Sequence, residues 1–396
     1  MARHLKLYRA LWGLSRNPFP DQAIAAAGDQ GQPFYERLHP GIASKMARAF
    51  IGSDGTQPNV AFLWSMGEGD EARGYGKTRY LLWFADRVNE DLGGTVARLA
   101  GRGSGTPALI ATYASFSTVD GLSLSNLLFD AVRDLVAVRH DTLNTLRQRA
   151  LAQGRDADDL YVDTLRLLNK GGEPWSPGLL RKLCDAEPRD WSEYLDNRQE
   201  FGQWHRVRYG RQMLRTAVAF LAELGVPRVL VLVDQVEDFA AAVTPSYKLK
   251  RDFPRLAELC QSDPLLRGRL TFVLTMHPRA ARVVSRYWPE GDLGPVGADG
   301  AMENVVRLGP MTRPRFGELV RTYLEAARVA AQPDTLFPFS EEVIDLVHQL
   351  DHGRPGYCLR RLFLLIESAA EDGHRAIERD YADEVLADQT SATREH

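Results

Sequence analysis

Cysteine is scarce in this 396-residue chain, and long apolar runs are missing. Cys184, Cys260 and Cys358 lie too far apart for a disulfide framework or a clustered metal site, so a reducing compartment, the cytoplasm, is expected. No apolar run approaches the ~20 residues of a transmembrane helix, which argues against a membrane span or a membrane partner. The basic N-terminus lacks the apolar core and cleavage site of a secretory signal.

A strong excess of one charge is also missing, because 49 basic residues stand against 52 acidic ones and the net charge is −3. Such a balance gives no general attraction to nucleic acid, so any contact with DNA must come from a local basic patch. The composition, 44% hydrophobic and 26% charged, is that of a globular chain with room for two or three domains.

The stretch VAFLWSMGEGDEARGYGKTRYLL, residues 60–82, has the order of elements that a phosphate-binding loop requires. An apolar run predicts a buried strand, four glycines follow, and a helix begins near Lys77 and Thr78. Lys77 is expected to reach the outer phosphates of ATP, and the Thr78 hydroxyl to bind Mg²⁺. Nucleotide contacts are predicted for Gly74, Tyr75, Gly76, Lys77, Thr78 and Arg79.

The glycine spacing departs from the usual G-x-x-x-x-G-K-T pattern, whose first glycine would fall at Glu71. Gly67 and Gly69 come earlier, as if the loop were two to four residues longer. A carboxylate at position 71 would repel phosphates unless it turns outward. An ordinary glycine-rich surface loop is the alternative, and the flanking strand and helix favour the phosphate-binding loop.

A second motif, RVLVLVDQVEDF (residues 228–239), contains five consecutive apolar residues that predict a strand buried on both faces of a parallel sheet. The strand ends in Asp234, and Glu237 and Asp238 follow. In nucleotide hydrolases one such carboxylate holds Mg²⁺ through water, and another orients the attacking water. The alternative is a plain strand whose Asp caps the next helix, and the glycine loop upstream favours hydrolysis.

Further strands are predicted at residues 108–116, 270–276 and 305–308. Thr275 lies near the end of the second of these, which is expected to be adjacent to the catalytic strand, and is placed to sense the γ-phosphate. Arg279 and Arg282 just beyond it either reach the nucleotide of a neighbouring subunit as arginine fingers or form a solvated helix face.

Helical periodicity continues through residues of about 140–215, between two predicted strands. This is far longer than the roughly 2–6 residues of a usual connection, so a helical insertion is expected. Trp175, Trp191 and Trp204 lie in it and are enough for a small core of its own.

From Thr312 onward the pattern is wholly helical, and FSEEVIDLVHQLDHGRPGYCLRRLFLLIESAAEDGHRAIERDYADEVL has a helix, a Gly-x-Pro turn and a long helix. Taken together, the chain resembles the AAA+ and allied STAND-type P-loop ATPases, in particular the initiator (origin-recognition-like) and transposition-regulator branch. The resemblance covers nearly the whole chain apart from the insertion. The string LVDQVEDF is similar to the Asp-Gln-Phe-Glu-Glu form of the acidic motif in STAND ATPases.

The resemblance puts the magnesium role on Asp234 and the catalytic role on Glu237, with Asp238 as the competitor. A Gln follows Asp234 where Asp-Glu is usual, which leaves the catalytic acid open. In the lid, Arg354 or Arg360 would replace the family's sensor arginine, unless that function is absent. Slow hydrolysis is then expected, with nucleotide acting mainly as an assembly switch.

The expected fold class is α/β: a P-loop NTPase parallel sheet flanked by helices, with a helical insertion and a C-terminal α-helical lid. The expected domains are an arm packing on the ATPase core (1–59), the core (60–310), the lid (311–388) and a disordered tail (389–396). In the arm, Pro18 and Phe19 either lie near the adenine or serve packing alone.

The resemblance implies a switch ATPase that binds and hydrolyses ATP, forms a homo-oligomer with nucleotide and acts on duplex DNA. Transposition, replication and antiviral (phage) defence are the settings it suggests, with a protein effector such as a nuclease or transposase. The alternative is a STAND-like signalling ATPase that gates a protein partner without nucleic acid. The helical lid and the acidic strand motif argue against a small-molecule kinase.

A basic surface would distinguish the first two functions, and the sequence has two candidate clusters. One lies on a single helical face at the end of the insertion, and the other follows the acidic motif. Either cluster is a DNA-phosphate contact or an ordinary solvated face. Their predicted DNA-contacting residues are Arg208, Arg211, Arg215, Lys248, Lys250 and Arg251.

Overall fold

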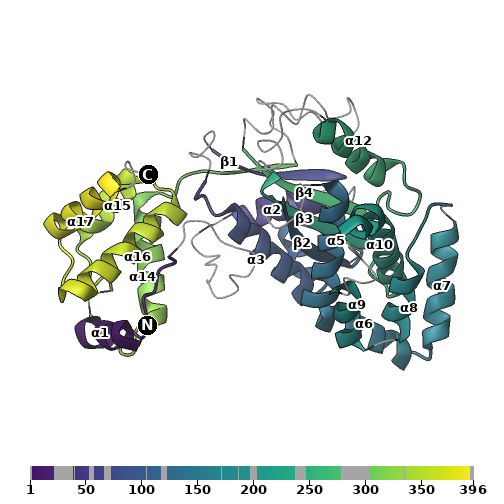
Figure 1. Cartoon of the computed structure of the whole chain (residues 1–396), viewed down its shortest axis with the longest axis horizontal. Helices are drawn as coiled ribbons and strands as arrows, with labels where there is room; N and C mark the ends of the chain where they lie inside the picture. Colours follow the sequence, from purple (N-terminus) through teal and green to yellow (C-terminus); the bar gives the residue numbers. More distant parts are fainter. Residues whose placement is uncertain are drawn as a thin grey trace. The chain divides into compact units, whose positions relative to one another are not determined.

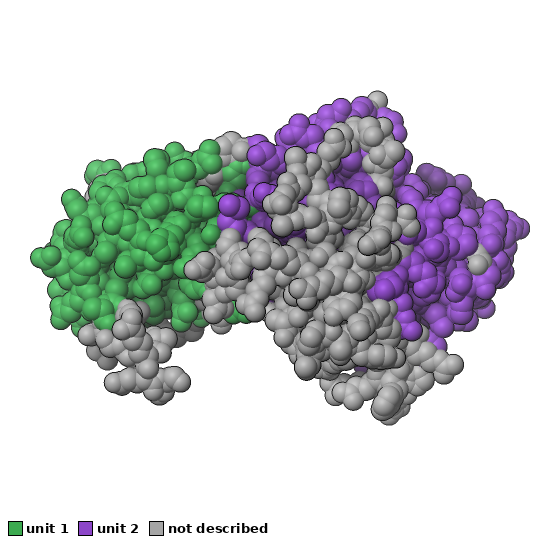
Figure 2. Space-filling model, turned by 90° about the horizontal axis from the view of Figure 1, so that it is seen from above, with its two compact units in different colours: residues 1–40, 69–79, 308–396 green, residues 41–68, 80–307 purple. Residues whose placement is uncertain are grey.

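The computed structural model describes residues 2–21, 39, 41–52, 58–66, 73–103, 105–116, 123–170, 172–185, 187–196, 203–236, 247–277, 304–333 and 335–392. The chain divides into two compact units, which Figure 2 colours separately. Unit 1 comprises Met1–Pro40, Gly69–Arg79 and Leu308–His396, and unit 2 comprises Gly41–Glu68 and Tyr80–Arg307. The end of the predicted phosphate-binding loop is therefore grouped with the C-terminal helices.

A five-stranded sheet runs through unit 2 in the order β2-β3-β4-β1-β5. Figure 1 labels the first four of these strands. Its strands are β1 (Val60–Ser65), β2 (Leu109–Ser115), β3 (Arg228–Asp234), β4 (Leu270–Met276) and β5 (Val305–Leu308). β2 pairs with β3, β3 with β4 and β4 with β1, all in parallel. The first four strands are buried along almost their whole length because helices cover both faces. The predicted fold class is confirmed.

Two pairs of helices cover the faces of this sheet. They are α2 (Ile42–Ile51) and α3 (Lys77–Glu90) on one face, and α5 (Leu124–Arg133) and α10 (Gln203–Glu223) on the other. The Phe50 ring of α2 and the Phe84 ring of α3 meet edge to face, with centroids 5.1 Å apart. The remaining helices of the sheet layer are α4 (Gly94–Leu99) and α12 (Tyr247–Gln261).

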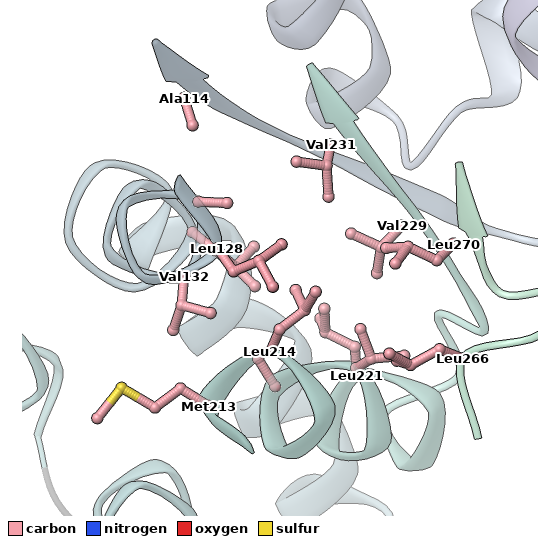
Figure 3. Packing of buried hydrophobic residues seen from close by; sticks show 14 of the residues in the cluster. Ala114, Leu128, Val132, Met213, Leu214, Leu221, Val229, Val231, Leu266 and Leu270 are labelled. Carbon is pink, nitrogen blue, oxygen red and sulfur yellow. The ribbon is translucent and has the colours of Figure 1, made fainter. Parts of the chain in front are cut away.

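Side chains alternate along β3, so every second residue faces α5 and α10. Val229 and Val231 point toward Leu128 of α5 and Leu214 of α10 (Figure 3), and all four belong to one buried cluster that also includes Val233. The residues between these valines face the other side of the sheet, where α2 and α3 lie.

The predicted helical insertion between β2 and β3 is present. It consists of a π-helical segment, η4 (Asp134–Val138), and of α6 (His140–Ala152), α7 (Ala157–Asn169), α8 (Pro177–Asp185), α9 (Pro188–Asp196) and α10. The prediction of a separate small core is wrong, because Leu160 and Trp191 belong to the same buried cluster as Val231. The reason is that α10 both ends the insertion and covers the sheet. Trp175 lies at the periphery of the cluster, and the Trp204 side chain is outside the described residues.

The outer edge of β2 is closed by side chains. Asn89 of α3 accepts a hydrogen bond from the Ala111 N–H at 2.8 Å and donates to the Ala111 carbonyl at 2.9 Å. Two residues farther along, the Tyr113 N–H donates to Asp134 Oδ2 at 2.8 Å. These contacts satisfy backbone groups that an edge strand otherwise leaves unpaired.

Unit 1 is helical. Its helices are α1 (Ala2–Trp12), α14 (Arg313–Ala327), α15 (Glu341–Leu350), α16 (Pro355–Asp372) and α17 (Arg379–Ala392), shown in Figure 1. The sequence predicted one N-terminal arm on the ATPase core, but the arm divides. α2 packs on β1 and β4, whereas Tyr8, Trp12 and Leu14 are buried in one cluster with Leu362 and Ile366 of α16.

Polar contacts fix α1 on the C-terminal helices. Trp12 Nε1 donates to the Arg375 carbonyl at 2.9 Å, and Asn17 Nδ2 donates to Glu367 Oε1 at 2.7 Å. The Tyr8 hydroxyl donates to the same Glu367 oxygen, and burial together with this carboxylate raises the pKa of Tyr8. These partners lie far from α1 in the sequence, which is why the arm was expected elsewhere.

The last helix extends farther than expected. α17 continues to Ala392, so the disorder predicted from residue 389 is wrong for residues 389–392.

All three cysteines are buried and free, and burial raises the pKa of Cys184 to about 12. Across the described ranges, every helix is too short or too polar to cross a membrane.

Removing the Asp263 carboxylate should strongly destabilise unit 2. Arg215 of α10 and Asp263 form an ion pair in which both side chains have no exposed surface. Asp263→Ala would leave the Arg215 charge buried and unpaired, a change that costs about 3–5 kcal/mol. Urea unfolding should show this loss. Glu193→Ala, which breaks the exposed Arg189–Glu193 pair, is the control and should change stability by less than ~1 kcal/mol. Equal, small losses would contradict the role of the buried pair.

Candidate functional site

Asp234, the last residue of β3, accepts hydrogen bonds from Thr275, Tyr113 and Gln235 among the described residues. Its side chain faces away from the α5 and α10 cluster, because the preceding Val233 belongs to that cluster, and it is 1% exposed. Thr275 Oγ1 donates to Asp234 Oδ1 at 2.8 Å, and the Tyr113 hydroxyl donates to Oδ2 at 3.1 Å. The Gln235 N–H donates to Oδ1 at 3.0 Å. These contacts hold the carboxylate in one orientation.

The carboxyl ends of β2, β3 and β4 meet at one edge of the sheet. Ser115 lies opposite Asp234 in the pairing of β2 with β3, and Val233 lies opposite Leu274 in the pairing of β3 with β4. Thr275 is therefore the neighbour of Asp234 across the strands, as the order of motifs predicted, and it is fully buried. Its role in sensing the γ-phosphate stays a prediction. What the geometry shows is that Thr275 holds the Asp234 carboxylate.

Gln235 turns the chain out of β3. Its φ of 56° lies in the left-handed region, which few residues other than glycine adopt. Its N–H also donates to Thr275 Oγ1 at 2.9 Å, and its side-chain oxygen accepts a hydrogen bond from Ser115 Oγ at 3.1 Å. The residue that replaces the usual acid thus fixes a turn. Outside the described residues lie the predicted catalytic Glu237, Asp238, Arg279 and Arg282.

The described end of the glycine loop leads directly into α3. Gly74 and Gly76 have φ values of 78° and 85°, which favour glycine, and the helix begins at Lys77. Lys77 and Thr78 are 8% and 9% exposed. The first N–H groups of a helix lack intrahelical acceptors, so this arrangement suits an anion such as a phosphate. Half-buried beside them are Tyr75 and Arg79.

The start of α16 contacts the same loop within unit 1. The Gly356 N–H donates to the Gly74 carbonyl at 2.8 Å. The Tyr357 ring lies against Gly74, where an added Cβ would come within 2.8 Å of Cε2. Sequence reasoning missed Tyr357, although it directly follows the Gly-Arg-Pro-Gly turn that identifies the lid.

The two candidate sensor arginines differ in position. The Arg354 guanidinium lies 4.6 Å from the centroid of the Tyr357 ring, and its Nε donates to the Asp351 carbonyl at 3.1 Å. Arg360 is exposed farther along α16. Of the two, the structure brings Arg354 to the residue that contacts the glycine loop.

Phe19 serves packing. Its ring is 4% exposed, stacks on Tyr323 at 5.9 Å and meets Phe339 at 5.8 Å, all within the core of unit 1. The adenine contact predicted for Phe19 is therefore wrong, because the ring is already enclosed by other aromatic rings. Pro18 before it is half-buried.

In the described part of the predicted DNA-contacting face of α10, both arginines, Arg211 and Arg215, lie against carboxylates. Arg215 is fully buried against Asp263, so its predicted DNA contact is wrong. Arg211 is 31% exposed and lies within 4.0 Å of carboxylates of Glu173, Glu258 and Asp263. Helical spacing correctly placed the two arginines on one face, but that face packs on acidic residues. Outside the described side chains lie Arg208, Lys248, Lys250 and Arg251.

The residues present fit ATP with Mg²⁺ better than a metal held by protein alone. Among the described residues, no group of three or more His, Cys, Asp or Glu side chains is arranged to hold a metal. Mg²⁺ in nucleotide sites takes one or two protein oxygens and completes its shell with phosphates and water. In unit 2 the Asp234 carboxylate is an oxygen ligand of this kind, and in unit 1 the Thr78 hydroxyl at the start of α3 is another.

Comparison with known proteins shows the fold. No family model and no curated protein matches the chain. The Aeropyrum pernix ORC2 protein in its ADPNP-ADP complexes is 15% identical, with a TM-score of 0.51 over 89% of this chain and 68% of that chain. Its ADP form is 14% identical, with a TM-score of 0.52 over 91% of this chain and 70% of that chain. The chain shares the fold of this ORC2 protein.

A structure of Drosophila ORC bound to DNA is also similar, at 10% identity over 98% of this chain and 66% of that chain. Its TM-score of 0.41 is too low for any conclusion about this chain.

An alanine at Gly74 should destabilise the protein more than an alanine at Gly101. Both glycines have φ near 80°, but Gly101 has open space around it whereas Gly74 faces the Tyr357 ring. Gly101→Ala should cost about 1–2 kcal/mol from backbone strain alone. Gly74→Ala should cost more in urea unfolding and should weaken binding of a fluorescent ATP analogue. Adding Tyr357→Ala should remove the excess. Equal losses for the two glycines would contradict the contact.

Proposed function

We propose that this chain binds ATP with Mg²⁺ and uses hydrolysis as a conformational switch. The observation that carries the proposal is the buried Asp234 carboxylate, held by Thr275 at a strand end, in a chain whose glycine loop ends at Lys77. Such a carboxylate suits a metal-bound water, and the start of a helix suits phosphates. The fold shared with an ORC2 protein solved in ADPNP-ADP complexes supports nucleotide as the ligand.

Each residue has a distinct role in this proposal. Lys77 neutralises the outer phosphates, Thr78 binds Mg²⁺ and Asp234 holds a water of its shell. Glu237 orients the attacking water, with Asp238 as the alternative. The arginine that senses nucleotide from the lid is Arg354, because it lies beside Tyr357 on the loop. Arg279 and Arg282 act on the nucleotide of a neighbouring copy in a homo-oligomer.

The wider function proposed is an action on duplex DNA. Since Arg215 is buried and Arg211 is ion-paired, DNA phosphates would be contacted by Lys248, Lys250 and Arg251 of α12. Transposition, replication and antiviral defence, with a nuclease or transposase as effector, remain the settings that the family resemblance suggests.

A second function is favoured by the same arginines. A STAND-like signalling ATPase would gate a protein partner and would need no basic surface. The burial of Arg215 and the pairing of Arg211 remove two of the six predicted DNA-contacting residues, which favours this alternative. DNA binding is therefore the measurement that separates the two.

Replacing Glu237 should separate nucleotide binding from turnover. Glu237→Gln should keep the affinity for a fluorescent ATP analogue and stop phosphate release, because the amide cannot accept the proton of the attacking water. Lys77→Ala is the matched variant for loss of binding. It should abolish binding of the ATP analogue while the circular dichroism spectrum stays unchanged. Wild-type turnover in Glu237→Gln would move the catalytic role to Asp238. Wild-type affinity in Lys77→Ala would overturn the phosphate-binding assignment.

If α12 contacts DNA, reversing two of its lysines should weaken the dependence of binding on salt. Each phosphate contact contributes roughly −0.9 to the slope of log affinity against log salt. Lys248→Glu with Lys250→Glu should therefore flatten the slope by about two units in ATP-dependent anisotropy titrations. Lys170→Glu with Arg189→Glu, at exposed positions of the insertion, should leave it unchanged. An absence of ATP-dependent DNA binding at low salt would favour the signalling function.

A further inference from the structure

Tyr113 is a residue of β2 whose hydroxyl reaches the candidate metal carboxylate of β3. It is 7% exposed, and its hydroxyl donates to Asp234 Oδ2 at 3.1 Å. The register of the two strands makes this contact possible. Tyr113 pairs with Leu232, so its ring runs along the same face of the sheet toward Asp234, two residues ahead.

The backbone of Tyr113 is held as firmly as its side chain. Its N–H donates to Asp134 Oδ2 at 2.8 Å, and Thr112 Oγ1 donates to the same oxygen at 3.0 Å. Asp134 begins the π-helical segment, and Arg139 at its end lies 3.8 Å from Asp134 and 2.7 Å from Asp86 of α3. Extra residues in a helical turn of this kind often occur beside functional sites.

The two oxygens of Asp234 have different donors. Oδ1 accepts hydrogen bonds from Thr275 Oγ1 at 2.8 Å and from the Gln235 N–H at 3.0 Å. Oδ2 is the oxygen that Tyr113 holds. A water of the magnesium shell would then meet an Oδ2 whose position is already set.

We propose that Tyr113 is a positioning residue for magnesium: its hydroxyl fixes Asp234 so that Oδ2 holds the metal-bound water in one place. This inference rests on the proposed nucleotide-binding function. In this role Tyr113 acts through its hydrogen bond to Asp234. Residues that orient a metal's ligands change metal affinity by about 10–100-fold when they are replaced. Because Asp234 acts through water, an effect near the lower end is expected.

The test is a magnesium titration of binding to a fluorescent ATP analogue in the full chain. Tyr113→Phe should raise the Mg²⁺ concentration for half-maximal tight binding about tenfold, while affinity measured in excess EDTA stays unchanged. A general loss of structure would instead lower the affinity for the ATP analogue both with Mg²⁺ and in excess EDTA. The control is Tyr381→Phe, which removes another Tyr-to-Asp hydrogen bond, from Tyr381 to Asp372 at 2.7 Å in unit 1, and should leave the magnesium midpoint unchanged.

A double-mutant cycle distinguishes a role through Asp234 from an independent one. In an Asp234→Asn background, Tyr113→Phe should have no further effect on the magnesium midpoint, because the oriented carboxylate is already gone. Additive shifts would overturn the inference, as would a Tyr113→Phe midpoint equal to that of the wild type. If the wild type itself binds no nucleotide, the proposed function fails and the inference fails with it, an outcome visible before any variant is made.

Discussion

Unit 2 depends on one constraint, which is that a carboxylate is buried at the end of a parallel strand. Asp234 is 1% exposed, and a charge in that position must find donors within the protein. Thr275 supplies one from β4 and Tyr113 another from β2. A shift of either strand by one residue would turn its donor to the other face of the sheet. The register that pairs the three strands is therefore the same register that places the donors around Asp234.

The central elements of this arrangement were predictable because they are local in the sequence. Five apolar residues before Asp234 indicate a strand covered on both faces, and parallel strands end at the same edge of a sheet. That is why Thr275 was expected near Asp234 and is found there. Gly74 and Gly76 have the positive φ values for which glycine is suited, and a helix begins at the residue that follows them.

Contacts between distant segments were less predictable. Helical spacing shows that Arg211 and Arg215 share a face, but not that Asp263 lies across from it. Phe19 lies between two prolines in the sequence, yet its ring is enclosed by Tyr323 and Phe339, some 300 residues farther along. Each of these errors has one physical cause: a pattern within a segment defines a face, and only the partner segment decides whether that face is buried.

The closed edge of β2 limits how copies of this chain can meet. The Asn89 side chain occupies both backbone groups of Ala111, and Asp134 occupies the N–H of Tyr113. A strand from a second molecule could extend the sheet here only by displacing these side chains, so the edge resists the backbone pairing from which fibrils grow. Proteins that assemble at high local concentration benefit from such resistance, because a high concentration then favours specific assemblies and does not promote pairing between exposed strand edges.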